Sequence, residues 1–342
     1  MRAAAFKEHG GLDTLQIMDL PTPEPQGDEV LVQVKACGLN HLDLWVRQGI
    51  PGVKPMPHVG GCEATGIVAK LGATASGFTV GQRVMIAPGL LPPRPSEWTT
   101  QGLDHVDPDY RVFGYQCQGG LAEYAVASSR DLIPISETWS FAEWAAVPLT
   151  FMTAWNMLYE RALLRPGDDV LVMGASSGVG VAAIQIAKSG GARVLAVAGG
   201  AEKGNKAREL GADHVIDYQT QDVAKEAQRL TGGRGVDIVF EHVGLAQFGA
   251  GIKALARNGR LVTCGATTGP KVEIDLRFFF TRQIVITGAY MGSRFDLLQC
   301  LKQVEAKKFR PIVDKIFPLA EARAAQERME KRQQFGKIVV TP

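Results

Sequence analysis

The stretch VLVMGASSGVGVAAIQIA, residues 170–187, decides the fold of the middle of this chain. Four apolar residues lead into a turn of small residues, and the turn leads into an apolar segment with helical spacing. Such a turn lets the backbone approach a diphosphate, whose charge is attracted by the free amides and the positive end of the following helix. Three residues occupy the fingerprint places of a dinucleotide-binding loop: Ala175, Ser177 and Gly180. The loop residues expected to contact a cofactor are Ala175, Ser176, Ser177, Gly178, Val179 and Gly180.

The segments around this loop alternate between strand and helix patterns, which disfavours the competing interpretation of a glycine-rich turn without a ligand. Such alternation predicts a parallel sheet covered by helices. Six strands, the number of a doubly wound dinucleotide fold, are expected. They are placed at 170–173, 193–197, 214–216, 237–240, 260–264 and 284–287, with helices at 179–188 and 202–210.

The first 148 residues have a different texture, with short apolar alternations separated by proline and glycine, which predicts a β-rich domain. Near the C-terminus, helices are expected at 296–307, 311–317 and 320–332, and a final strand at 337–340 is expected to return to this first domain. The sequence therefore predicts an α/β protein of two domains. One comprises 1–150 and 291–342, and the other, which binds the nucleotide, comprises 151–290.

Composition excludes several classes of function. Lys and Arg number 37 against 35 Asp and Glu, so the net charge of +2 lacks the concentrated basic surface that nucleic acid requires. The five cysteines form no CxxC pair, which is typical of reduced thiols. No apolar segment reaches the roughly 18 residues of a membrane span. We expect a cytoplasmic protein that binds neither nucleic acid nor membrane.

The end of the second expected strand favours NADPH as the cofactor. An NAD enzyme usually has an Asp or Glu there for the ribose 2′-hydroxyl, but residues 196–201 contain no carboxylate. A 2′-phosphate would therefore meet no repulsion at Gly199, Lys203 can pair with it, and Tyr218 can donate a hydroxyl to it. The competing interpretation of Lys203 is a solvated position on a helix.

Four motifs, in order along the chain, resemble the medium-chain dehydrogenase/reductase superfamily. They are CGLNHLD at 37–43, GCEATGIV at 61–68, PLTFMTAW at 148–155 and FGKIVV at 335–340, with the nucleotide loop before the last of them. A short-chain dehydrogenase is disfavoured, because no tyrosine here has the Tyr-x-x-x-Lys spacing. The resemblance implies a GroES-like catalytic domain interrupted by a Rossmann domain. It also implies a homodimer, or alternatively a homotetramer.

At the catalytic zinc positions of that superfamily this chain has Asn40, Cys62 and Leu149, of which only Cys62 is a plausible ligand. The stretch 88–110, which corresponds to the structural-zinc lobe, contains no cysteine. We therefore expect no metal. Cys62 is interpreted as a buried small residue, with a reactive role as the alternative. Asp43 and Glu63 are expected to orient neighbours or to pair with Arg332 or Lys337.

Without zinc, the resemblance narrows to NADPH-dependent quinone oxidoreductase-like enzymes, which have an Asn at position 40. It implies hydride transfer to quinones or α,β-unsaturated carbonyls, assisted by hydrogen bonds from Asn40, His41 or Thr153. The proton donor stays open between His41, a tyrosine and water, and His41 has a core or second-shell position as its alternative. The nicotinamide would be lined by Asn40, Thr153, Gly265, Ala266, Thr267, Tyr290 and Met291, and a phosphate would lie near Arg332 or Lys337.

Three alternatives to this function remain: a zinc-type alcohol dehydrogenase, an enoyl-thioester reductase and a noncatalytic NADPH-binding protein. Two segments have mainly structural interpretations. Phe278–Phe280 is expected to pack under the last strand, with a substrate wall or dimer surface as alternatives. The lobe at 88–117 is long enough to suggest a lid or a subunit contact.

Overall fold

A computed structural model describes residues 1–342, and the chain divides into two compact units. The first comprises Met1–Leu149 and Ser293–Pro342, and the second comprises Thr150–Gly292. The expected boundaries at 150 and 291 lie close to these divisions. None of the helices is long and apolar enough to cross a membrane.

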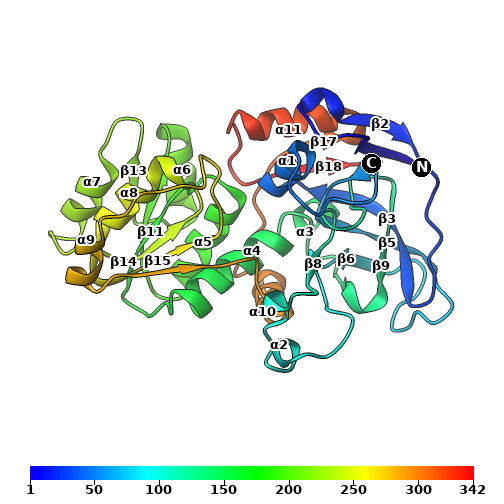
Figure 1. The fold of residues 1–342 in the computed structure, drawn as a ribbon, viewed down its shortest axis with the longest axis horizontal. Helices are drawn as coiled ribbons and strands as arrows, with labels where there is room; N and C mark the ends of the chain where they lie inside the picture. The colour runs from blue at the N-terminus through cyan, green and yellow to red at the C-terminus, as the bar shows by residue number, and fades with distance from the viewer. The chain divides into compact units, whose positions relative to one another are not determined.

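The second unit is built on a six-stranded parallel sheet with the strand order β13-β12-β11-β14-β15-β16. Its strands are β11 (Asp169–Val172), β12 (Arg193–Ala198), β13 (His214–Asp217), β14 (Val236–Glu241), β15 (Leu255–Thr263) and β16 (Val285–Gly288). Figure 1 shows the helices of this unit packed around the sheet. They are α4 (Pro148–Trp155), which continues as a π-helix at Asn156–Arg161, α5 (Gly178–Ser189), α6 (Ala201–Glu209), α7 (Val223–Leu230), α8 (Leu245–Ala254) and α9 (Leu276–Arg282). The predicted doubly wound Rossmann fold is confirmed.

The strand order places the topological switch point between β11 and β14, because the chain leaves β11 in one direction and returns to pair with it from the other side. Ligands of doubly wound sheets bind outside the carboxyl ends of the strands at this point. Val170, Leu171 and Val172 are fully buried, as expected for a central parallel strand covered on both faces. The central strand therefore presents the loop that follows it at the place where a nucleotide binds.

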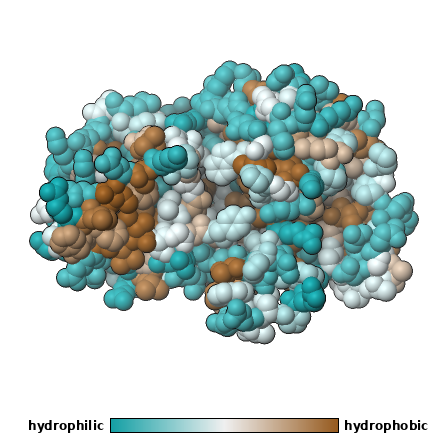
Figure 2. Space-filling model, in the orientation of Figure 1, coloured by the Kyte–Doolittle hydropathy of each residue, from teal (hydrophilic) through white to brown (hydrophobic).

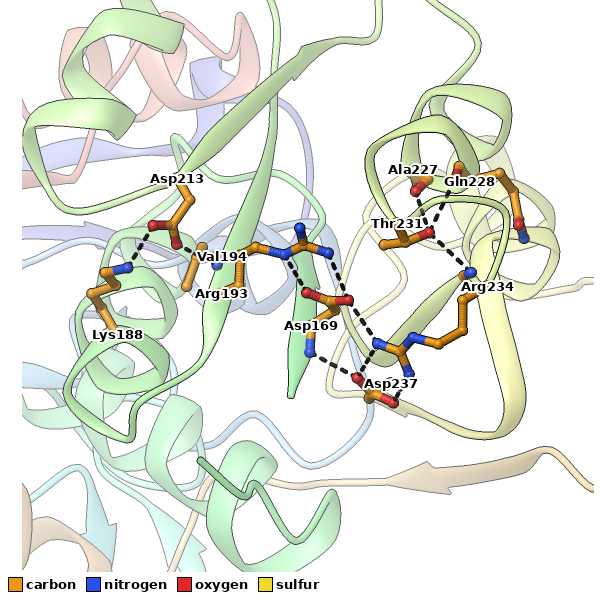
Figure 3. A network of polar contacts seen from close by, with 11 residues as sticks. Asp169, Lys188, Arg193, Val194, Asp213, Ala227, Gln228, Thr231, Arg234 and Asp237 are labelled. Carbon is orange, nitrogen blue, oxygen red and sulfur yellow. Dashed lines mark hydrogen bonds and ion pairs between the residues drawn. The ribbon is translucent and has the colours of Figure 1, made fainter. Parts of the chain in front are cut away.

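A network of ion pairs lies at the opposite, amino-terminal end of the same strands (Figure 3). The buried Asp169 carboxylate accepts hydrogen bonds from Arg193 at 2.5 and 2.8 Å and from Arg234 at 2.6 Å. Arg234 also pairs with Asp237, which accepts a bond from the Asp169 amide at 2.8 Å. These contacts join β11, β12 and β14 away from the nucleotide edge, so we interpret the network as structural.

The first unit is β-rich, with three sheets. The largest has the strand order β10-β6-β5-β3-β18-β17, with β9 paired to β3, and the smaller ones have the orders β2-β1-β4 and β7-β8. The strands are β1 (Arg2–Phe6), β2 (Gln16–Asp19), β3 (Glu29–Gly38), β4 (His58–Val59), β5 (Glu63–Leu71), β6 (Arg83–Ile86), β7 (Gly89–Leu90), β8 (Arg111–Val112), β9 (Tyr124–Ser128), β10 (Leu132–Pro134), β17 (Val313–Pro318) and β18 (Lys337–Thr341). The helices are α1 (His41–Gln48), α2 (Glu97–Thr100), α3 (Phe141–Trp144), α10 (Arg294–Glu305) and α11 (Ala322–Glu330), with 3-10 turns at Leu12–Thr14, Asp104–Val106, Ser129–Asp131 and Leu319–Glu321.

The C-terminal segment confirms one prediction and corrects another. β18 returns to the first unit and pairs antiparallel with β3, as expected. The segment 311–317 was predicted to be helical, but Val313–Pro318 is strand β17, which runs parallel to β18. Backbone pairing along β18 favours the extended conformation here, and the β-branched and aromatic residues Val313, Ile316 and Phe317 suit a strand.

The three phenylalanines of α9 divide between core and surface. Phe278 and Phe279 pack against the apolar core of the second unit, as predicted. Phe280 is 67% exposed. The packing interpretation therefore holds for the first two residues only.

Candidate functional site

The predicted phosphate loop is a tightly closed turn at the carboxyl end of β11. Ser177 caps α5, and its Oγ accepts a hydrogen bond from the Gly180 amide at 2.9 Å. Gly174 has φ +57°, a conformation that favours glycine, and a Cβ on Gly180 would lie 2.5 Å from the Gly174 carbonyl oxygen. The two ends of the turn are therefore packed closely together. The unpaired amides at the start of α5 remain available to bind an anion.

Gly199 and Tyr218 meet at the ends of β12 and β13. A Cβ added to Gly199 would lie 2.9 Å from the Tyr218 hydroxyl oxygen and 3.0 Å from two carbons of its ring. The tyrosine ring therefore occupies the place that an acidic side chain at position 199 would need. The structure brings these two predicted residues together, and Lys203 lies in the first turn of α6, which begins at Ala201.

Sequence analysis missed a carboxylate at the same edge. Asp217 Oδ1 accepts hydrogen bonds from the Gly200 amide at 3.2 Å and from the Gln219 amide at 3.0 Å. It ends β13 and not β12, so inspection of residues 196–201 alone did not reveal it. An acid near the expected ribose position is a feature of sites that bind a 2′-hydroxyl.

Glu241 forms hydrogen bonds with groups at the ends of both β14 and β15, although sequence analysis gave it no role. Its buried carboxylate accepts the amides of Val243 and Gly244, both at 2.7 Å, and the Thr263 hydroxyl at 2.8 Å. The turn after β14 is therefore fixed in place. It packs against the loop after β15, since a Cβ on Gly244 would lie 2.9 Å from Cα of Ala266.

The predicted nicotinamide-lining residues of this unit lie in three places. Gly265, Ala266 and Thr267 form the loop after β15, and the Thr267 hydroxyl donates to the carbonyl groups of His242 and Val243 at 3.3 and 3.2 Å. Tyr290 and Met291 follow β16, where Tyr290 is 53% exposed and Met291 is buried. Thr153 lies in α4.

The Thr153 hydroxyl is buried and has no hydrogen-bond partner. A buried hydroxyl without a partner is unfavourable by about 1–3 kcal/mol, so it requires a ligand or a water molecule. Together with the closed phosphate loop, this orphaned group fits a site for a nicotinamide dinucleotide.

A cavity of about 710 Å³ lies in the same unit, along α7 and α8. Its lining residues are Tyr218, Gln221, Asp222, Val223, Ala224, Lys225, Gln228, Gln247, Ala250 and Lys253. Tyr218 contributes both to this cavity and to the contact with Gly199. The cavity therefore adjoins the end of β12, and its volume is typical of small-molecule sites.

In the first unit, Asn40 is the centre of a buried polar cluster. Its Nδ2 donates to Glu63 Oε2 at 2.8 Å and to Cys62 Sγ at 3.2 Å. Its Oδ1 accepts from Lys337 Nζ at 2.8 Å. Lys337 Nζ also donates to the Leu39 carbonyl oxygen at 2.6 Å and forms an ion pair with Glu63.

Two expectations for this cluster change as a result. Both amide protons of Asn40 are used by protein acceptors, which argues against the expected donation to a substrate. Lys337 is buried and its three donors are all used, so it is not placed to bind a cofactor phosphate. Lys337 pairs with Glu63 instead, a pairing that the sequence analysis gave as one of the expectations for Glu63.

Burial and hydrogen bonding set the protonation of the neighbouring groups. Burial raises the pKa of Asp43 to about 6, against the opposing effect of hydrogen bonds from the amides of Asn40 and Gly61. These bonds, at 2.7 and 2.8 Å, hold the start of α1 against the segment between β4 and β5. Burial also raises the pKa of Cys62 well above its usual value, so its thiol is unreactive at neutral pH.

Comparison with known proteins agrees with this architecture. Residues 26–137 match the alcohol dehydrogenase GroES-like domain family, and residues 178–306 match the zinc-binding dehydrogenase family. A quinone oxidoreductase from Mus musculus is 30% identical over 96% of this chain and 93% of its own length. The crystal structure of an NAD-dependent alcohol dehydrogenase is 44% identical, with a TM-score of 0.96 and full coverage of both chains. The crotonyl-CoA reductase of Streptomyces avermitilis is 28% identical over 96% of this chain and 82% of its own length.

The chain belongs to the medium-chain dehydrogenase/reductase superfamily. It is an oxidoreductase.

The zinc-ligand positions of the superfamily do converge in this member. Asn40 and Cys62 are in contact, and the Leu149 amide donates to Glu63 Oε1 at 2.6 Å. Asn40 has a carboxamide and Leu149 an aliphatic side chain where zinc enzymes have ligand side chains. Across the whole chain, no group of three or more His, Cys, Asp or Glu side chains is placed to hold a metal ion.

Two further predicted residues lie in the GroES-like unit of this superfamily member. His41 begins α1, and its ring centroid lies 6.3 Å from that of Trp45. Arg332 is exposed just beyond the end of α11. The proposed role of each stays a prediction.

Proposed function

We propose that this protein transfers hydride from NADPH to quinones or α,β-unsaturated carbonyls without zinc. The observation that carries the proposal is the buried cluster in which Asn40, at one zinc-ligand position, is bound by Glu63 and Lys337. A catalytic zinc site needs three protein ligands. The Lys337 ammonium group and the Asn40 carboxamide are neither anionic nor imidazole groups, so they do not complete such a set. A substrate that must first lose a proton to a metal is therefore disfavoured.

The bound nicotinamide supplies the hydride, and the residues of this chain position the acceptor. A conjugated acceptor delocalises the arriving charge itself, so hydrogen bonds suffice to assist it. The unpartnered Thr153 hydroxyl is the donor best supported by the structure, because both Asn40 protons are already used. The proton donor is His41, a tyrosine or water.

Position 199 supports NADPH as the cofactor. Tyr218 fills the space of an acidic side chain there, and Lys203 follows in the first turn of α6. We assign the adenosine half of the cofactor to the cavity beside Tyr218. NADH is the second candidate, favoured by the Asp217 carboxylate near Gly200 and by the name of the 44% identical relative.

A second candidate function is alcohol oxidation, favoured by that same relative, and a third is reduction of enoyl thioesters, favoured by the crotonyl-CoA reductase similarity. Noncatalytic NADPH binding is the remaining alternative.

A panel of acceptors separates these candidates. The purified protein is mixed in a stopped-flow instrument with NADPH or NADH and a quinone, an enone, an enoyl thioester or an aldehyde, and its zinc content is measured on the same sample. We expect fast oxidation of NADPH by quinones or enones, with no stoichiometric zinc. One zinc per chain together with alcohol oxidation would overturn the proposal, and no oxidation by any acceptor would indicate a binding protein.

We also propose that two copies associate through the edge strand β16, which pairs only with β15. An unpaired strand edge is a template for another chain, and a second copy offers the same edge across a two-fold axis. Figure 2 shows an apolar patch over α8 and α9, and exposed Leu276, Phe280 and Val285 lie on α9 and β16.

Replacing Phe280 with aspartate is expected to weaken this dimer. Burying a charge at an apolar interface without a partner is unfavourable, so we expect the dissociation constant to rise at least about tenfold. Sedimentation equilibrium measures it, with Phe295→Asp, an exposed phenylalanine of the other unit, as the control. If the parent protein is monomeric, or if both variants behave alike, this interface is wrong.

A further inference from the structure

His242 connects the end of β14 to the phosphate loop, although sequence analysis gave it no role. Its Nε2 lies 3.2 Å from Ser177 Oγ, the residue that caps α5. The ring also lies against Gly174, where an added Cβ would be 2.7 Å from His242 Cε1 and 3.0 Å from Nε2. The imidazole therefore packs directly against the first turn of the loop.

The hydrogen bonds of Ser177 define the state of the imidazole. Ser177 Oγ already accepts a bond from the Gly180 amide, and its single proton needs an acceptor. His242 Nε2 is in position to accept it, which requires the neutral tautomer that carries its proton on Nδ1. With that tautomer, the serine hydroxyl points toward the histidine and away from an anion on the loop.

The position of His242 is fixed from its own strand. Glu241 accepts the amides of Val243 and Gly244, so the backbone on both sides of His242 is held. The loop after β15 covers it, since a Cβ on Gly265 would lie 3.1 Å from the His242 carbonyl oxygen. The imidazole cannot leave Ser177 without disturbing this turn.

Burial favours a neutral His242 ring in the free protein. Burial lowers the pKa of His242, while attraction to Glu241 and the backbone carbonyls of Met173 and Gly174 oppose the shift. Glu241, at the end of β14, is the charged group that acts on the ring. The phosphate loop, residues 174–180, contains no ionisable side chain, and burial raises the pKa of Cys264 after β15 to about 12, so that thiol is neutral.

We infer that His242 is a positioning residue for the cofactor diphosphate, and that it takes up a proton from solvent when the diphosphate binds beside Ser177. This inference rests on the proposed function, because it requires a dinucleotide on the phosphate loop. Protonation gives Nε2 a proton to donate to Ser177 Oγ. The serine hydroxyl is then released from the histidine and donates its own proton to a phosphate oxygen.

The negative charge of the diphosphate stabilises the imidazolium, so the pKa of His242 is higher in the complex than in the free protein. By linkage, affinity rises as pH falls through the range between the two values and is constant above both. Without proton uptake, the serine hydroxyl is released only if the neutral imidazole changes to the tautomer that carries its proton on Nε2, and affinity would then not depend on the pH in this range.

The test is the pH dependence of the dissociation constants of NADH and NADPH between pH 8 and pH 6, measured by nicotinamide fluorescence. For the parent protein we expect NADH affinity to rise about three- to tenfold over this range. His242→Gln keeps an acceptor for Ser177 but does not titrate, so its NADH affinity should change less than about twofold. The 2′-phosphate of NADPH also titrates. Its contribution is common to both proteins, so dividing the NADPH affinity of the parent by that of the variant at each pH removes it.

Calorimetry of the parent protein in two buffers of different ionisation enthalpy provides an independent measurement. At about pH 6.5 we expect the binding of NADH to take up a fraction of one proton. This measurement uses only the parent protein, so it does not depend on the folding of any variant. Equal pH slopes in parent and variant, or no proton uptake, would overturn the inference and leave the proposed function intact. No binding of either dinucleotide at any pH would overturn both.

Discussion

Replacing Lys337 with methionine is expected to lower the free energy of unfolding by about 3–5 kcal/mol. Lys337 and Glu63 are both buried, and the substitution leaves the Glu63 carboxylate without its ammonium partner. The change also removes the donor to Asn40 Oδ1, so the carboxamide loses the contact that fixes its orientation. Urea denaturation at pH 7 measures the loss, and the rate of NADPH oxidation is expected to fall with it.

Replacing both partners separates the lost ion pair from a simple packing defect. In Glu63→Gln with Lys337→Met no buried charge is left unpaired, so we expect much of the stability to return. Lys331→Met is the matched control, because Lys331 pairs with Glu327 on the exposed face of α11 and should change stability by less than about 1 kcal/mol. A single variant as stable as the parent would show that the buried pair does not hold this cluster.

Replacing Lys203 with alanine is expected to weaken NADPH binding about tenfold and to leave NADH binding nearly unchanged. A charge-assisted hydrogen bond to a phosphate contributes about 1.5–3 kcal/mol, and only NADPH has the 2′-phosphate. Because the contact is remote from the reacting atoms, the loss should appear in KM and not in kcat. Fluorescence titration and steady-state kinetics with both cofactors measure these effects.

Lys206→Ala is the control for this experiment, since Lys206 lies on the same helix and pairs with Glu202 at 2.7 Å. Its removal deletes the same charge from α6 without a proposed phosphate contact. If the parent protein uses NADH and NADPH equally, the assignment of Gly199, Lys203 and Tyr218 to a 2′-phosphate is wrong. A preference for NADH would instead indicate that Asp217 binds the ribose.

Local patterns were sufficient for most of the fold. The strand, turn and helix around residues 170–187 lie in continuous sequence, so hydrophobic periodicity and turn residues identify them directly. The segment 311–317 shows the limit of such patterns. Its apolar spacing suits a short helix as well as a strand, and the pairing of β17 with β18 resolves the ambiguity.

The candidate site residues that were missed make contacts between distant parts of the chain. Asp217 is associated with Gly200 because β13 lies beside β12, and His242 reaches Ser177 because β14 lies beside β11. A sequence pattern shows which residues end a strand. It does not show which strands are neighbours or where their side chains meet.

The phosphate loop, the two-part organisation and the unusual residues at the zinc positions were therefore readable from the order of the amino acids, because each depends on short-range geometry or on the chemistry of single residues. The roles of Asn40 and Lys337 were not. Residues 40, 63 and 337 become one buried unit only when β18 returns to β3. Their burial then requires each charge and amide to be paired, so packing between distant segments assigns Lys337 to Glu63 and not to a phosphate.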